Sequence, residues 1–187
     1  MRLRNSLIIL GVLEDQDIEW FVRVGQTTVL QEADILIEEG IHIESLWFVL
    51  DGALTVTTVH DTSKVLGTVY PGEIVGEVSL LDSRPPAVTL IAAESTTVLQ
   101  ISRSELKTKL SNDTGFASRF YRAVGIVLAQ RLIHLTHTTL TVSTIGKVGS
   151  ANPGEVEGSS VVDPEVLEAM SLASRRFEYL LERATRN

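Results

Sequence analysis

The chain has 187 residues, of which 44% are hydrophobic, and a formal net charge of -8. This length suits a single domain with extensions, and the negative charge excludes a broad electrostatic surface for nucleic acid or anionic membrane. Cysteine is absent, which excludes disulfides and thiolate chemistry and agrees with a cytoplasmic location.

The N-terminal apolar run is followed directly by Glu14 and Asp15. It is too short to cross a bilayer and has no small-residue cleavage site, so we predict an ordinary packed segment and no membrane span. The next ten residues, 15–24, place Ile18, Phe21 and Val22 on one side of a predicted helix. We expect this helix to cover the domain that follows.

Between Gln26 and Ser102 the sequence reads as short strands separated by turns at regular spacing. This pattern is typical of a β-sandwich or barrel. Strands are expected at 27–30, 35–38, 46–50, 54–57, 65–70, 88–92 and 96–101, and Asp51-Gly52 predicts a hairpin turn. The predicted fold class is mainly β with flanking helices, a β-roll of the double-stranded β-helix or jelly-roll type.

Helical patterns follow the roll. Ser102 is a candidate N-cap of a short helix, with Glu105 at the capping-box position. A long helix is expected over 116–137, because apolar residues recur there at spacings of three, four and seven. This stripe, which we predict to form a dimer interface, consists of Phe116, Phe120, Val124, Val127, Leu128 and Leu135.

The C-terminal part is organised differently. Residues 141–163 are rich in glycine and serine and lack periodicity, which predicts a flexible linker between a domain at 1–140 and a terminal segment at 164–187. Pro164 and Glu165 favour a helix start. The resulting amphipathic helix has an apolar face that either folds back on the domain or docks on a partner protein.

The segment 71–89, PGEIVGEVSLLDSRPPAVT, has the features of an anion cradle. Gly76 permits close approach of the backbone to a ligand. A short helix over 78–81 offers free N–H groups to a phosphate, and Glu77 can accept hydrogen bonds from sugar hydroxyls. The residues of this turn that we predict to bind a ligand are Gly76, Glu77, Val78 and Ser79.

Three motifs resemble the cyclic-nucleotide-binding domain family, which is also found in bacterial regulators of the catabolite-activator class. They are EEG at Glu38–Gly40, LWFVLDGALTV at Leu46–Val56 and PGEIVGEVSLL at Pro71–Leu81. The resemblance implies a non-enzymatic regulatory module with cyclic AMP or cyclic GMP as candidate ligand. It also implies that Glu77 binds the ribose 2′-hydroxyl, although a helix N-terminal acid satisfied by local amides is the alternative.

The resemblance further implies that the long helix forms the seam of a homodimer and approaches the bound base. Arg131 and His134 lie near the end of that helix. Either they stack beside a base or they are solvated positions that flank the seam.

One position departs from the family pattern. The residue before the small pair Ala87-Val88 is usually an arginine that binds the cyclic phosphate, and here it is Pro86. Loss of such a charge pair costs roughly 3–5 kcal/mol. Arg84 lies two residues upstream and either replaces this arginine or is an exposed loop residue. The further ligand-binding residues that the resemblance implies are Val75, Arg84, Pro86, Ala87 and Val88.

Other functions have weaker support. His42 and Glu44 resemble part of a cupin metal motif, but no partner histidine follows, so no metal and no catalytic residue are predicted. The C-terminal segment is too short for a winged helix-turn-helix, which argues against DNA binding. The remaining alternative is a domain without ligand that acts as an adaptor through its terminal helix.

Overall fold

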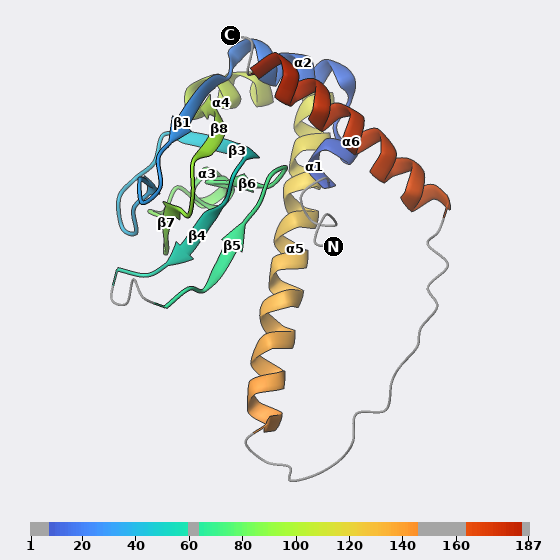
Figure 1. Cartoon of the computed structure of the whole chain (residues 1–187). Coiled ribbons are helices and arrows are strands. Elements are labelled where there is room, and N and C mark those ends of the chain that lie inside the picture. Colours follow the sequence, from blue (N-terminus) through green and yellow to red (C-terminus); the bar gives the residue numbers. More distant parts are fainter. Residues whose placement is uncertain (1–7, 60–63, 146–163, 185–187) are drawn as a thin grey trace.

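Eight short strands and six helices make up the parts of the chain that the computed structural model describes, residues 8–59, 64–145 and 164–184 (Figure 1). Side chains are described in these segments except at 8, 134–145 and 164–170. The strands are β1 (Gln26–Leu30), β2 (Ile35–Ile37), β3 (Ser45–Asp51), β4 (Leu54–Thr57), β5 (Gly67–Val69), β6 (Ile74–Val75), β7 (Thr89–Ala92) and β8 (Thr96–Ser102). The helices are α1 (Ile8–Val12), α2 (Asp15–Val24), α3 (Glu77–Asp82), α4 (Arg103–Asn112), α5 (Thr114–Ile145) and α6 (Pro164–Ala184).

The strands form two four-stranded antiparallel sheets that face each other as a β-roll. Their orders are β1-β8-β3-β6 and β2-β7-β4-β5. Helix α3 is inserted between β6 and β7, and the other helices gather beside the first sheet (Figure 1). The predicted fold class is confirmed.

Strand β3 is buried on both faces because it separates two hydrophobic cores. Leu46, Phe48 and Leu50 point into a core shared with the helices. Trp47 and Val49 point into the core between the sheets. Since side chains alternate along a strand, this central position explains why the segment reads as a continuous apolar run.

An aromatic cluster fastens the helices to the roll. Phe21 of α2 lies 4.9 Å from the ring of Phe48 on β3 and 5.8 Å from the ring of Phe116 on α5. Phe120 stacks on Phe116 one turn later. Because these rings come from three elements, their packing fixes where α5 leaves the roll.

One local prediction is wrong, and one is confirmed only in part. Gly52 has the positive φ of 79° expected in a tight turn, but β3 and β4 pair with different strands, so Asp51-Gly52 joins the two sheets and is no hairpin. Ser102 occupies the N-cap of α4 without a side-chain capping hydrogen bond, because its hydroxyl lies 2.8 Å from that of Ser104.

The C-terminal elements differ in extent from the prediction. Helix α5 continues to Ile145, so the first residues of the expected linker are helical, and residues 146–163 lie outside the described segments. Helix α6 folds back and packs against α1 and α2 (Figure 1). None of the helices within the described segments is long and apolar enough to span a membrane.

Candidate functional site

The segment predicted as a cradle lies where β6 ends and α3 begins, and anion binding there stays a prediction. Gly76 is the N-cap of α3 and has a φ of 94°, a left-handed conformation that favours glycine. A Cβ at this position would lie 2.9 Å from the carbonyl oxygen of Ser45. Glycine is therefore required both by the turn and by the close approach of β3. Beside it, Val75 and Ser79 are buried, whereas Val78 is exposed.

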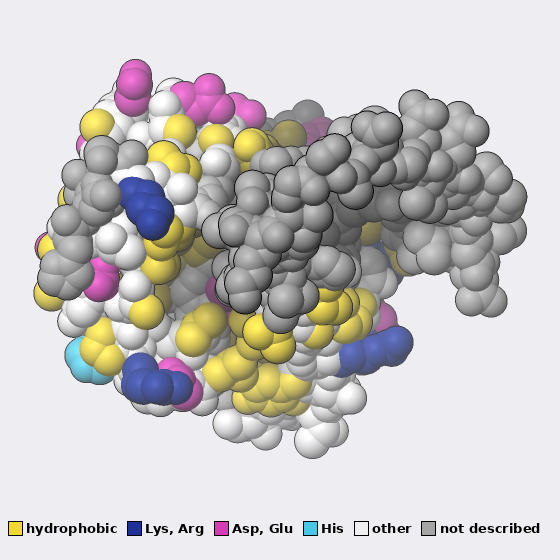
Figure 2. Space-filling view, turned by 90° about the horizontal axis from the view of Figure 1, so that it is seen from below, with side chains coloured by type: hydrophobic (Ala, Val, Ile, Leu, Met, Phe, Trp, Pro, Cys, Tyr) yellow, Lys and Arg dark blue, Asp and Glu magenta, His cyan; other side chains and the backbone are white. Residues whose placement is uncertain are grey.

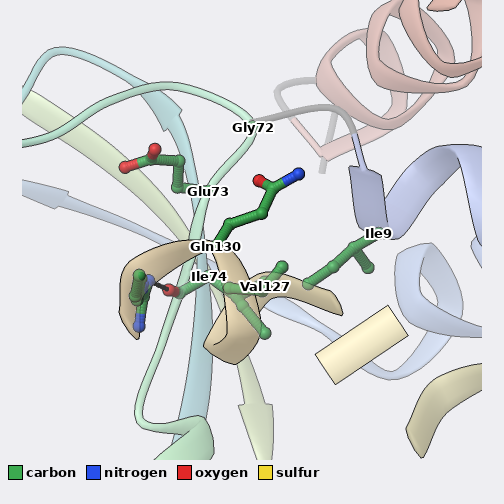
Figure 3. Close-up of a pocket in the computed structure, with 7 residues that line it drawn as sticks. Ile9, Gly72, Glu73, Ile74, Val127 and Gln130 are labelled. Carbon is green, nitrogen blue, oxygen red and sulfur yellow. Dashed lines mark hydrogen bonds between the residues drawn. The ribbon is translucent and has the colours of Figure 1, made fainter. Parts of the chain in front are cut away.

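Glu77 is the first residue of α3, and it is only 2% exposed. Its Oε1 accepts a hydrogen bond from Nη1 of Arg131, which reaches it from α5. Nη2 of Arg131 donates to the carbonyl oxygen of Ile74 at 2.8 Å, the contact drawn as a dashed line in Figure 3. Arg131 therefore binds both β6, the last strand before the cradle, and Glu77, the acidic residue of the cradle. Arg131 is thus paired within the chain, and its stacking beside a base stays a prediction.

Two acidic groups near Arg131 have raised pKa values. Burial raises the pKa of the Glu77 carboxyl above its ordinary value, and the guanidinium of Arg131 opposes this shift. Burial likewise raises the pKa of Glu73, whose carboxylate also accepts a hydrogen bond from the backbone N–H of Tyr70. One cation is thus shared by two carboxyl groups in a partly desolvated setting.

A small cavity of about 30 Å³ lies next to Glu73 and Arg131, between α1, α5 and the segment that leads into β6. Glu73, Gln130, Arg131 and Ile9 are among its lining residues. Figure 3 shows Gln130 extending from α5 toward Gly72 and Ile9. Small-molecule sites usually enclose about 300–1,000 Å³, so this cavity is a packing feature at the junction of α1 and α5.

The loop that closes the cradle lacks a cation directed inward. The side chain of Arg84 is 83% exposed and pairs with Asp82 at 2.5 Å, as the exposed-loop alternative expects. Pro86 is half-buried, and its carbonyl oxygen accepts a hydrogen bond from Gly40 N at 2.9 Å. Ala87 is exposed and Val88 half-buried. Ligand binding by these residues stays a prediction.

The described part of the apolar stripe of α5 faces the inside of the folded chain. Phe116, Phe120 and Val124 are buried in the core shared with the roll, Val127 is nearly so, and Leu128 packs against it. These side chains do not form an external surface, and the side chain of Leu135 lies outside the described residues. Among the side chains of α5 up to Ile133, those of Tyr121, Leu132 and Ile133 are large, hydrophobic and exposed.

Figure 2 shows hydrophobic side chains gathered on the end of the molecule seen from below, with scattered charged groups between them. Within the described segments, no group of three or more histidine, cysteine or acidic residues is placed to hold a metal ion. His42 and Glu44 are both exposed.

The sequence analysis missed the pairing of Arg131 with Glu77. The two residues are 54 positions apart, and no local spacing connects them. The available signal was the resemblance, which placed Arg131 on the helix that approaches the cradle. The sequence did not indicate that Arg131 on this helix would pair with the buried carboxylate of Glu77.

Comparisons with known proteins agree with this architecture. The family described as "Cyclic nucleotide-binding domain" matches residues 27–113. The Pycsar effector protein XpPycTIR of Xanthomonas perforans is 26% identical over 123 residues, which are 64% of this chain and 37% of that protein. The chain thus spans little more than a third of that relative's length.

Two solved structures share the fold. A cyclic nucleotide-binding domain from Methylobacillus flagellatus matches with a TM-score of 0.65 at 18% identity, covering 80% of this chain and 86% of that one. The catabolite activator protein of Thermus thermophilus matches with a TM-score of 0.61 at 17% identity, covering 94% of this chain and 87% of that one. The β-roll and the family match together identify residues 27–113 as a domain of the cyclic nucleotide-binding family.

Proposed function

We propose that the chain is a non-enzymatic regulatory module that binds a cyclic nucleotide atypically, or another small anionic ligand, and signals through its C-terminal helices. The observation that carries this proposal is the contact of Arg131 with Glu77, since it joins the cradle directly to α5. A ligand hydroxyl that competes for the Glu77 carboxylate would alter the hold of α5 on the cradle. Such a differential contact is what a ligand-driven switch requires.

The similarity to a protein named as a Pycsar effector supports a regulatory role of this kind. A cytoplasmic location remains part of the proposal.

A second candidate is an adaptor that has kept the fold and binds no nucleotide. It is favoured by Pro86 at the position of the phosphate-binding arginine and by Arg84, which is exposed and paired with Asp82. Glu77 already has a charged partner within the chain. In this form the helices would contact a protein partner independently of any ligand.

Binding of the four common 3′,5′-cyclic mononucleotides, measured by isothermal titration calorimetry, separates the two candidates. The natural chain is compared with Pro86→Arg and with Pro85→Arg, a control at the neighbouring exposed proline. A new charge-assisted contact to the phosphate contributes about 2 kcal/mol or more, roughly a 30-fold gain in affinity. We expect this gain for Pro86→Arg alone.

The result also decides between the candidates. Measurable affinity of the natural chain, strengthened by Pro86→Arg, supports the sensor. If all three proteins are folded and none binds at about millimolar nucleotide, the sensor of cyclic nucleotides is rejected and the adaptor is retained.

We also propose that the chain forms a homodimer through the outward face of α5. Tyr121 is 50% and Leu132 66% exposed, and the two lie on one side of α5 because eleven residues make about three helical turns. Large exposed apolar side chains on one helix face favour association. Analytical ultracentrifugation of the natural chain and of Tyr121→Glu with Leu132→Glu tests this. A dimer that becomes a monomer in the double variant supports the proposal, and a natural chain that is monomeric overturns it.

A further inference from the structure

Helix α6 lies across the N-terminal helices α1 and α2 (Figure 1). Ala173, Leu180 and Ala184 are buried along one face of α6. Phe177 and Leu181 pack, partly buried, against the same core. Their spacing of four, three, one and three residues places all five on one side of a helix. The terminal helix is therefore part of the folded unit and covers its own apolar face within the chain.

Arg176 is the polar anchor of this contact. Its Nη1 donates to the carbonyl oxygens of Leu10 at 2.9 Å and Leu13 at 2.5 Å, and its Nε donates to Oδ1 of Asp15 at 2.6 Å. The Arg176 side chain is 12% exposed, whereas that of Asp15 is 78% exposed. Carbonyls at the end of a helix lack donors within that helix. Arg176 supplies such donors at the end of α1, and these contacts contribute more than the exposed ion pair.

A second contact fixes the other end of α6. The hydroxyl of Thr27, at the start of β1, donates to the carbonyl oxygen of Ala184 at 2.6 Å. The docked helix is thus held to α1 by Arg176 and to the roll by Thr27. The two contacts can be removed independently.

Helix α1 connects this anchor to the cradle. It has only five residues, too few for a stable isolated helix, and it packs against both α5 and α6. Ile9 is buried and lines the small cavity together with Gln130 and Arg131. One short helix therefore contacts both the docked α6 and the side of α5 that holds Glu77.

We propose that α6 is an intramolecular clamp that keeps α1 in place through Arg176, and that α1 in turn keeps Arg131 on Glu77. Release of α6 then loosens the contact between Arg131 and Glu77 through α1. Linkage requires the reverse effect as well: separation of Arg131 from Glu77 weakens the docking of α6 by the same factor. This coupling is a property of the chain without ligand.

Hydrogen exchange of the full-length chain without nucleotide tests the clamp. Arg176→Gln is compared with Arg175→Gln, a matched control at the adjacent exposed arginine. Because hydrogen bonds of a charged donor to backbone carbonyls are lost, we expect exchange in residues 8–12 to rise about tenfold or more. Exchange in residues 72–77 and 127–131 should rise with it, and Arg175→Gln should match the natural chain.

Faster exchange confined to residues 8–12 would overturn the coupling, and unchanged exchange throughout would overturn the role of Arg176 as anchor. If Arg176→Gln raises exchange across the whole chain, Thr27→Val decides. That variant weakens the docking of α6 without removing the contacts of Arg176. The clamp therefore requires a smaller rise of exchange in the same three segments, and unchanged exchange there overturns it. Because no nucleotide is present, failure here is distinct from failure of the proposed ligand binding.

Discussion

Arg131 of α5 donates to the buried carboxylate of Glu77, the first residue of α3, and to the carbonyl of Ile74 two residues after Gly72. The guanidinium thus bridges the strand and the helix that form the cradle. Since Glu77 is almost completely removed from water, this cation is its main electrostatic compensation. The stability of the cradle and the position of α5 therefore depend on one contact.

Arg131→Gln should destabilise the chain by about 3–5 kcal/mol, because it leaves the Glu77 carboxylate buried without a charged partner. Urea denaturation measures the loss, and Arg122→Gln, an exposed arginine of the same helix, serves as the control. In the double variant with Glu77→Gln most of the loss should disappear, since no buried charge remains. Equal losses in the single and double variants would contradict the pairing.

Gly76→Ala should lower the free energy of unfolding by about 1–3 kcal/mol. The φ of 94° is unfavourable for alanine, and its Cβ would meet the carbonyl of Ser45 at 2.9 Å. Gly67→Ala is the matched control, because a Cβ there meets nothing within 4 Å. Thermal and urea unfolding should rank the two variants in that order. Similar stability of both would argue against a strained turn at the cradle.

Asp17 of α2 and Arg119 of α5 form a second long-range pair. Nε and Nη2 of Arg119 donate to the two carboxylate oxygens at 2.7 and 2.8 Å, and Asp17 is 0% exposed. Arg119→Gln should therefore cost about 3–5 kcal/mol, whereas Arg23→Gln, at an exposed position of α2, should change stability little. Urea denaturation measures the free energy of unfolding of both variants. Equal losses in the two would contradict a stabilising pair between Arg119 and Asp17.

Titration of Glu73 should contribute to the pH dependence of the free energy of unfolding. Burial raises its pKa in the folded state above the ordinary value of 4.5, so the folded state binds more protons than the unfolded one. Its contribution to stability is therefore fully present below pH 4.5 and is lost as the pH rises through the folded-state pKa. Relative to the natural chain, Glu73→Gln should become more stable with rising pH over about pH 4–8.

Asp82→Asn provides a control of opposite sign. The backbone N–H of Arg84, followed by its guanidinium, lowers the pKa of Asp82 below 3.8. The stability that Asp82 contributes is present above pH 3.8 and is lost as the pH falls, so Asp82→Asn should be less stable than the natural chain at neutral pH. Chemical denaturation across the pH range checks both variants. Differences with the same pH trend would contradict the assigned environments.

The local parts of this molecule follow from local patterns. The strand alternation predicted every strand except the two-residue β6, and the spacing of Ile18 and Phe21 gave the bounds of α2 correctly. The cradle was predicted from Gly76 and Glu77, because a left-handed turn and a helix start depend on a few neighbouring residues. The assignment of β3 and β4 to different sheets was not predicted, since a turn signal reports a change of direction and not the strand that pairs next.

The amino-acid sequence by itself determined the β-roll and the place of the cradle. It also showed that position 86 is a proline and not the phosphate-binding arginine usual in the family. Only the tertiary structure decided that Arg131 binds Glu77, that the stripe of α5 from Phe116 to Val124 faces the core of the chain and that α6 docks through Arg176. These contacts join residues 54 to 166 positions apart. Their energies depend on burial and on meeting a partner, and both exist only after the whole chain has folded.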